Sequence, residues 1–169
     1  MKRIFFVALL ALIVNINSFA QDDNKMYTAF IVNVARNISW NGLAQDQDFV
    51  ISVMGNEKLA ASLSAKLTDK FIGFHKIVVK SASKSAEVSN SSIIVMSESM
   101  YKIMPQIAND LQSKQSIIIA CSKGQCANGA DLSLYNAGDK LGFQLSDNRI
   151  KGHGLAVSAK LRDLGEIVD

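Results

Sequence analysis

Four short apolar runs divide the chain, and they predict strands. They are FVISVM at 49–54, HKIVVK at 75–80, SIIVMS at 92–97 and SIIIAC at 116–121. Runs of Ile and Val without apolar–polar alternation are typical of strands that helices cover on both faces, as in parallel sheets. We therefore expect a mostly parallel sheet with a layer of helices on each side.

The segments between these runs have the 3.6-residue spacing of helices. Residues 23–40 are predicted to form the first helix, with Trp40 closing it and Val32 off its buried stripe and exposed. Trp40 is either a core or boundary aromatic or part of a binding site. Segments 56–67 and 98–112 predict two more helices, and Pro105 should kink the second or mark a boundary in it. The buried stripe of the first helix is Met26, Tyr27, Phe30, Ile31, Val34 and Ile38.

The last third of the chain predicts a hairpin and then a helix. Residues 130–146 alternate apolar and polar positions around the turn sequence NAGD. Residues 147–165 predict a final helix, and the serine-rich segment 81–92 predicts a surface loop. The order of elements predicts one α/β domain. It is a three-layer α/β/α sandwich with a mostly parallel mixed sheet of about five to six strands and an antiparallel hairpin near the C-terminus.

The N-terminus has the features of a signal peptide. Lys2 and Arg3 precede an apolar run of about eleven residues, and Ser18 to Ala20 offers small residues at a cleavage site. The run is shorter than the roughly 20 residues that span a bilayer. We predict cleavage between Ala20 and Gln21, which makes residues 1–20 the signal peptide and 21–169 a single soluble, exported domain in the periplasm. An uncleaved anchor and a buried helix are the alternatives.

Removing this leader changes the charge. It holds two of the 18 basic residues and none of the 15 acidic ones, so the mature chain carries 16 − 15 = +1. A charge this close to zero gives no support to a nucleic-acid partner. The remaining 149 residues (169 − 20) are the usual size of one domain with one sizeable core.

Cys121 and Cys126 are the only cysteines, and four residues separate them. In an oxidising compartment two such cysteines pair by default, and Gly124 allows the chain to reverse between them. We predict a local disulfide that contributes at most about 2 kcal/mol. A redox-responsive form of the same bond is one alternative. A metal site is another, although His75 and His153 follow no zinc-finger spacing.

Little in the sequence points to catalysis. Gly55 and Asn56 join a strand to a helix and could hold an anion on free N–H groups, but an ordinary turn is the simpler interpretation. His75 is expected at the core or its rim, and His153 on a solvated basic face with Arg149 and Lys160. The chain has no nucleophile elbow and no zinc-protease motif. We predict no enzymatic activity, no cofactor and no bound metal.

The ordered segments resemble the YfiR-like periplasmic family. The resemblance covers about residues 25–164, including KMYTAFIVNVARNISW and LGFQLSDNRIKGHGLAVSAKLRDLG. Asn41 stands where the family has proline, Ser146 where it has asparagine and Ser92 where many members have cysteine. Only one of two disulfides that the family can form would therefore remain. The matching positions are Trp40, Gly55, Gly73, Phe143, Gly154, Leu155, Ser158, Lys160 and Leu161.

This resemblance implies a non-enzymatic regulator in cyclic-di-GMP signalling. Its best-known members restrain an inner-membrane diguanylate cyclase by binding its periplasmic region, and a peptidoglycan-associated outer-membrane lipoprotein relieves the restraint. Other members accompany sensor kinases. We expect a negative regulator that binds such a membrane protein, with self-association into a homodimer as a weaker expectation. The alternatives are a periplasmic small-ligand-binding domain, with Gly55 and Asn56 at the ligand, and an envelope accessory. The candidate interaction residues are Val32, Trp40, Arg149, His153 and Lys160.

Overall fold

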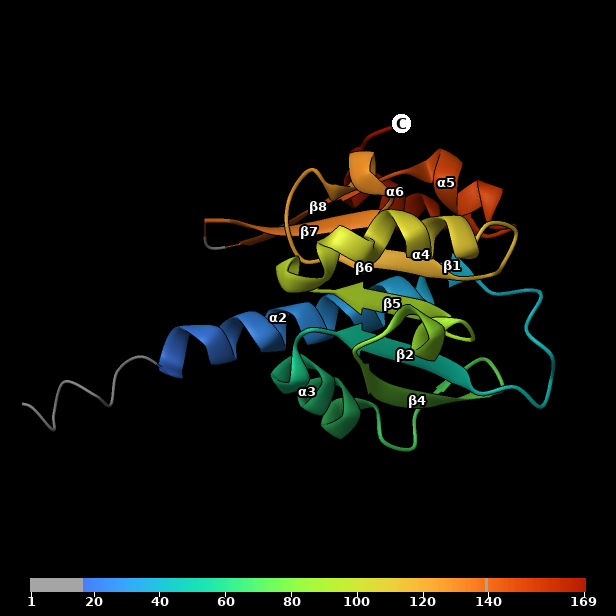
Figure 1. The fold of residues 1–169 in the computed structure, drawn as a ribbon, viewed down its shortest axis with the longest axis horizontal. Helices are drawn as coiled ribbons and strands as arrows, with labels where there is room; N and C mark the ends of the chain where they lie inside the picture. Colours follow the sequence, from blue (N-terminus) through green and yellow to red (C-terminus); the bar gives the residue numbers. More distant parts are fainter. Residues whose placement is uncertain (1–16, 139) are drawn as a thin grey trace, which may run out of the picture.

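The computed structural model describes residues 17–138 and 140–169, with side chains from residue 24 on (Figure 1). Most of the predicted signal peptide therefore lies outside the described residues. The first described helix, α2 (Asn17–Arg36), runs through the predicted cleavage site between Ala20 and Gln21. Cleavage stays a prediction.

Eight strands form the main sheet, in the order β10-β8-β7-β6-β5-β2-β4-β3. Neighbours from β4 to β7 pair in parallel, whereas β3 and β8 run antiparallel to β4 and β7. The strands are β2 (Phe49–Met54), β3 (Phe71–Ile72), β4 (His75–Ala82), β5 (Ile93–Met96), β6 (Ile117–Ala120), β7 (Leu132–Ala137), β8 (Lys140–Leu145) and β10 (Glu166–Ile167).

The mostly parallel mixed sheet and the C-terminal hairpin of β7 and β8 confirm the predicted α/β fold. The sheet has eight strands rather than five to six, because β3 and β10 add one at each edge. Each of these two strands has two residues, which is too short to leave a periodic pattern in the sequence.

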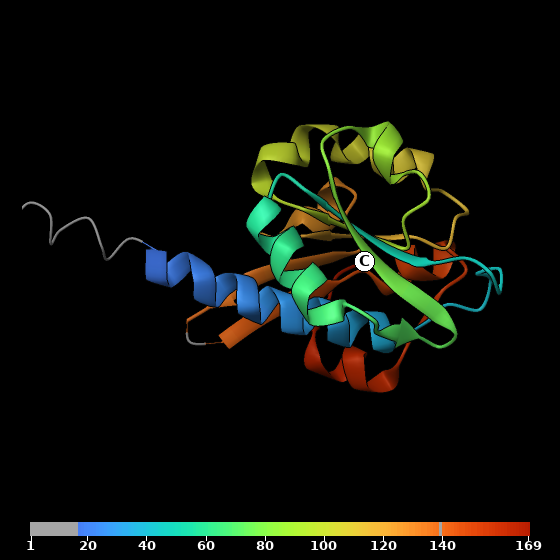
Figure 2. The ribbon, with the colours of Figure 1, turned by 90° about the horizontal axis from the view of Figure 1, so that it is seen from below.

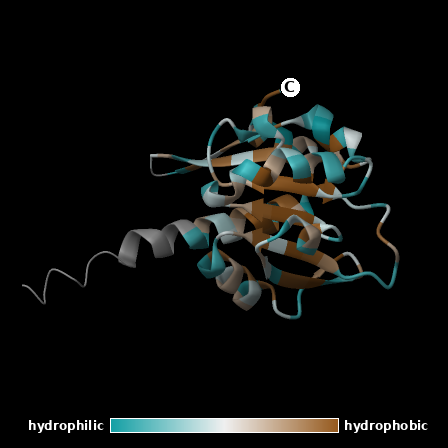
Figure 3. Cartoon of the chain, viewed as in Figure 1, coloured by the Kyte–Doolittle hydropathy of each residue, from teal (hydrophilic) through white to brown (hydrophobic). Residues whose placement is uncertain are grey.

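Helices cover both faces of the sheet, and this explains the unbroken apolar runs (Figures 1 and 2). In β5, Ile93 and Val95 pack toward α2 and α3 (Glu57–Leu67), while Ile94 and Met96 pack toward α4 (Met104–Asp110). All four side chains are fully buried. Figure 3 shows the result as a band of hydrophobic central strands.

Short 3-10 turns complete the connections on the α4 side. They are η1 (Ser85–Val88), η2 (Glu98–Ile103) and η3 (Gln125–Asn128). Pro105 lies in the first turn of α4, directly after η2, so it marks a boundary as predicted. The turn η1 falls inside the predicted serine-rich loop.

The predicted single C-terminal helix is wrong. The segment instead forms α5 (Asp147–Gly152), β9 (Ala156–Val157), α6 (Ala159–Leu164) and β10. Gly154 has a positive φ of 71° and turns the chain after α5, a conformation that glycine adopts without strain. Ser158 then caps α6, because its Oγ accepts from the backbone N–H of Leu161 at 3.2 Å.

The first helix also ends earlier than predicted, at Arg36 rather than Trp40. The chain leaves the helix because β1 (Ile38–Ser39) pairs antiparallel with β9 in a separate two-stranded sheet. Asn37 strengthens this connection: its carbonyl accepts from the N–H of Ser158 at 2.9 Å, and its side-chain oxygen accepts from the Ser158 hydroxyl at 3.0 Å. The two ends of the domain are thereby joined.

Candidate functional site

Trp40 follows β1 and is buried rather than helical. Its indole N–H donates to the carbonyl of Ala35 at 2.8 Å, and its ring meets that of Phe49 edge-on with centroids 4.8 Å apart. Trp40 is therefore held in place at the edge of the core. One side of it still lines a groove of about 370 Å³.

The other wall of this groove is the turn between β3 and β4, at residues 71–75. Gly73 has a φ of 58° at its tip, and the aromatic residues on each side of it point outward. Phe74 is 90% exposed and Phe71 is 54% exposed. We call the cavity and these two phenylalanines the hairpin groove. Its further lining residues are Ala35, Arg36, Ile38, Asn41, Ile72 and His75.

His75 is half-buried, which agrees with its predicted place at the rim of the core, and it also lines the hairpin groove; its Nδ1 is 2.8 Å from the carbonyl oxygen of Gln47. The sequence pattern does not predict the exposure of the two phenylalanines, because apolar residues next to a strand are normally taken as core. The available signal was weak. The segment FIGF has one phenylalanine before and one after Gly73, and a turn this tight cannot bury both of them.

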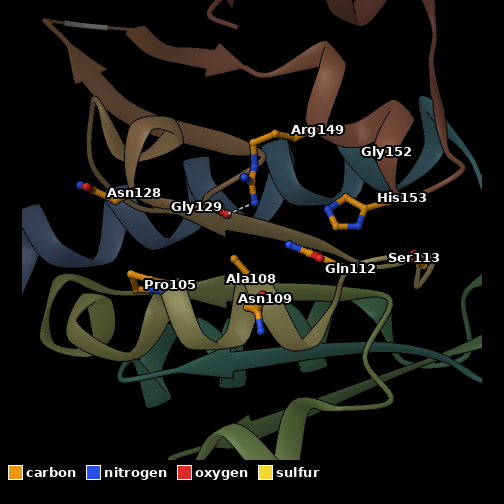
Figure 4. Close-up of a pocket in the computed structure, with 10 residues that line it drawn as sticks. All are labelled: Pro105, Ala108, Asn109, Gln112, Ser113, Asn128, Gly129, Arg149, Gly152 and His153. Carbon is orange, nitrogen blue, oxygen red and sulfur yellow. Dashed lines mark hydrogen bonds between the residues drawn. The ribbon is translucent and has the colours of Figure 1, made fainter.

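A second cavity, of about 570 Å³, lies between α4 and α5 (Figure 4). We call it the α4–α5 cleft. Residues of α4 and the turn after it form one side, and residues of η3 and α5 form the other. The lining residues are Pro105, Ala108, Asn109, Gln112, Ser113, Asn128, Gly129, Arg149, Gly152 and His153.

A buried acidic residue, Asp131, lies behind the lining of this cleft and contacts two of its residues, Arg149 and His153. It is 1% exposed, and its Oδ2 accepts from the backbone N–H of Ile118 at 2.7 Å. Its Oδ1 lies 3.2 Å from Nε2 of His153 and 3.6 Å from Nε of Arg149. A buried carboxylate is tolerated only with such partners, so Asp131 fixes both basic side chains in place.

The prediction that His153 points into solvent is wrong. The residue is the C-cap of α5, and its backbone N–H bonds back to the carbonyl of Arg149, so its side chain turns inward to Asp131. Arg149 is half-buried rather than fully outward. Its Nη2 donates to the carbonyl of Gly129 at 2.7 Å, as Figure 4 shows.

The other predicted interaction residues do not join these two. Lys160 is exposed, as expected, but lies on α6. Val32 is half-buried and packs against the main core, so its predicted exposure is also wrong. The five predicted residues are therefore spread over α2, the segment after β1, α5 and α6, and they form no common surface.

Gly55 and Asn56 form an ordinary strand-to-helix turn. Asn56 caps α3, because its side-chain oxygen accepts from the N–H of Leu59 at 2.9 Å. Gly55 has a φ of 78°, and a side chain there would collide with Ser97 and Ser99. The contacts of both residues within the protein account for the pair without a ligand.

The two cysteines are free thiols in the structure, and the predicted disulfide between them stays a prediction. They belong to different environments. Cys121 follows β6 and packs against the main core, where burial, aided by the charge of Glu98, raises its pKa to about 12. Cys126 lies in η3 with its Sγ 3.3 Å from the hydroxyl of Ser133 on β7, and burial raises its pKa as well.

Comparison with protein families decides the relationship. The YfiR/HmsC-like family matches residues 24–166, which is most of the chain. The chain belongs to the YfiR/HmsC-like family. No curated protein matches it. Members of this family are known as periplasmic regulators, so membership supports a regulatory role in the periplasm. Within the part of the chain that the structure describes, no helix is long and apolar enough to cross a membrane.

Proposed function

We propose that this YfiR/HmsC-like protein is an exported negative regulator that acts by binding and not by catalysis. It uses the hairpin groove to bind the periplasmic region of an inner-membrane signalling protein, a diguanylate cyclase or a sensor kinase. The observation that carries this proposal is the exposure of Phe71 and Phe74 beside a cavity lined by Trp40.

Exposed aromatic side chains of this kind forgo the free energy that burial would provide. Burying a phenylalanine side chain contributes about 1.5–3 kcal/mol, and aromatic residues are enriched among those that dominate binding energy at interfaces. Within the fold Phe74 gains almost none of this stabilisation, since it is 90% exposed. A partner that covers the turn would gain it.

The groove also indicates the chemistry of its partner. Apolar walls from Ile38, Trp40 and Ile72 would take an apolar side chain, while the exposed Arg36 would pair with a carboxylate or a backbone carbonyl. The partner segment is thus apolar with an acidic flank. Family resemblance supports the membrane signalling protein as this partner, and an outer-membrane lipoprotein as the protein that releases it.

Site-specific photo-cross-linking in the host tests the proposal. A benzoylphenylalanine at position 74 should cross-link to an inner-membrane protein with a periplasmic region. The same probe at Gln106, which is exposed on α4, should not. Replacing Phe71 and Phe74 with serine should abolish the cross-link from a probe at Asn41 and change the cyclic-di-GMP level in the same direction as deletion of the gene.

Two outcomes would contradict the proposal. The first is a cross-link from position 74 only to a second copy of the chain, which would make the groove a dimer interface. The second is a double serine variant that folds and keeps normal signalling.

A further inference from the structure

The α4–α5 cleft has a lining suited to a negatively charged ligand. Among its described lining residues Arg149 is the one with a permanent charge, and none is acidic. The opposite side carries the exposed side-chain amides of Asn109 and Gln112. A cavity of about 570 Å³ is within the range of small-ligand sites, roughly 300–1,000 Å³.

Arg149 is held in place before any ligand arrives. Its Nε lies against Asp131 and its Nη2 donates to the carbonyl of Gly129. The side chain is nevertheless 35% exposed and lines the cleft, and it has N–H groups beyond those two contacts with which to bind a ligand. A guanidinium fixed in this way offers the planar fork that binds a carboxylate through two parallel hydrogen bonds.

His153 is a second, independent indication that the cleft is built for polar contacts. Its side chain is 8% exposed and lines the cleft, with Nε2 next to Asp131. Its Nδ1 is buried and has no hydrogen-bond partner in the described structure. Buried polar atoms without partners are uncommon, and a ligand or an ordered water in the cleft would relieve this cost.

We propose that the α4–α5 cleft binds a small organic carboxylate. Arg149 binds the carboxylate group of this ligand, and the side-chain amides of Asn109 and Gln112 bind its other polar groups. Asp131 favours a monoanion over a phosphate dianion, because its buried negative charge, 3.6 Å from Arg149, offsets part of the attraction. The binding is therefore weak and reversible. The proposal does not rest on the hairpin groove, which lies on a different part of the domain.

Nuclear magnetic resonance titration of the ¹⁵N-labelled protein tests this. The probes are N-acetylglycine, its neutral counterpart N-acetylglycinamide, and inorganic phosphate. N-acetylglycine should shift the Arg149 Nε–H signal and the backbone signals of Asn128 and Gly129 in a saturable manner. The neutral amide should bind at least about tenfold more weakly, since it lacks the charge. Phosphate should also be weaker.

Variants separate the site from general anion binding. Arg149→Lys keeps the charge but loses the fork and should weaken N-acetylglycine binding about tenfold. The exposed substitutions Asn109→Ala and Gln112→Ala should each weaken it several-fold, and Gln106→Ala on the same helix should change nothing. Since the two α4 variants alter exposed residues, they test the site even if Arg149→Lys fails to fold.

Three results would overturn the proposal: no saturable shift at the cleft, equal binding of the acid and its amide, or equal binding of phosphate. Unchanged binding in both α4 variants would show that the cleft is not the site.

Discussion

Apolar side chains are normally buried and charged ones exposed, and the hairpin groove and the α4–α5 cleft depart from this rule in opposite directions. In the groove, two large apolar side chains lie in water, with Phe74 at 90% and Phe71 at 54% exposure. At the cleft, a histidine of the lining and the acidic side chain behind it are removed from water, with His153 at 7% and Asp131 at 1% exposure. Both features cost free energy. The cost of the exposed phenylalanines matters for binding, whereas the cost of the buried polar groups matters for folding.

The exposed phenylalanines are almost uncoupled from folding, because they make few contacts that unfolding would break. The buried polar cluster is strongly coupled to folding, because each member compensates the desolvation of another. Substitutions of the two exposed phenylalanines should therefore affect mainly binding, whereas substitutions in the cluster under the cleft should affect stability first. Measured stabilities can test this division.

The largest effect is expected for Asp131→Ala. This change leaves the N–H of Ile118 without its acceptor and leaves His153 and Arg149 without their carboxylate. Removing one partner of a buried pair typically costs 3–5 kcal/mol, so the free energy of unfolding should fall by about that amount. Urea denaturation at neutral pH measures it.

Two variants control this experiment. Asp163→Ala removes an exposed carboxylate from α6 and should change stability by no more than about 0.5 kcal/mol. Asp131→Asn keeps an oxygen for Ile118 but loses the charge, and should lie between the two. If Asp131→Ala were as stable as Asp163→Ala, the buried cluster would contribute nothing to the fold.

Trp40→Ala should cost about 3 kcal/mol, the low end for a truncated core aromatic. It removes the edge contact with Phe49 and the hydrogen bond to Ala35. This prediction divides the hairpin groove itself into a structural side and a binding side. Thermal unfolding of Trp40→Ala beside Phe71→Ser checks it, and equal losses in the two variants would contradict the division.

Alkaline pH should destabilise the protein through Cys121. The folded-state pKa of this thiol is about 12, against 9.0 for an unperturbed cysteine, because burial disfavours the thiolate. Its contribution is fully present below pH 9 and is lost as the pH rises through the interval from about 9 to 12. Over that interval the melting temperature of Cys121→Ala should decline less steeply than that of the wild type.

Alkylation of the same two cysteines tests the predicted disulfide. Iodoacetamide without reductant should label both thiols of the unfolded protein and label the folded protein slowly, since both thiol pKa values are raised. Failure to label the unfolded chain would show that Cys121 and Cys126 are paired in the purified protein.

The smallest effect on stability is expected for Phe74→Ser, because this side chain is almost fully in water. The free energy of unfolding should change by no more than about 0.5 kcal/mol. Chemical denaturation measures it, and a loss above 1 kcal/mol would mean that Phe74 supports the turn and not only a partner.

The sequence predicted those parts of the fold whose pattern is local. The runs at 93–96 and 117–120 indicated covered strands, because helices bury both faces of each. The C-terminal segment was mispredicted because α5 and α6 have six residues each and β9 has two, lengths at which helical and strand periods cannot be told apart. Pairing with β1, at the other end of the chain, decides its structure.

The candidate sites were less predictable for a similar reason. The burial of His153 depends on Asp131, which an intervening hairpin separates from it in the sequence. Arg149 and His153 were both predicted as interaction residues, but on an outer surface and not at a cleft. The exposure of Phe71 and Phe74 follows from the short edge strand β3, and composition alone favours burial of both.

The pairing of β1 with β9 also affects the order in which parts of the domain can fold. Asn37 and Ser158, which bond to each other, are 121 positions apart in the chain. Contacts this distant in sequence form late and slow the folding of a domain. A chain that ends before residue 156 would lack the partner of β1 and the bond between Asn37 and Ser158, so the segment after α2 would have no strand to pair with.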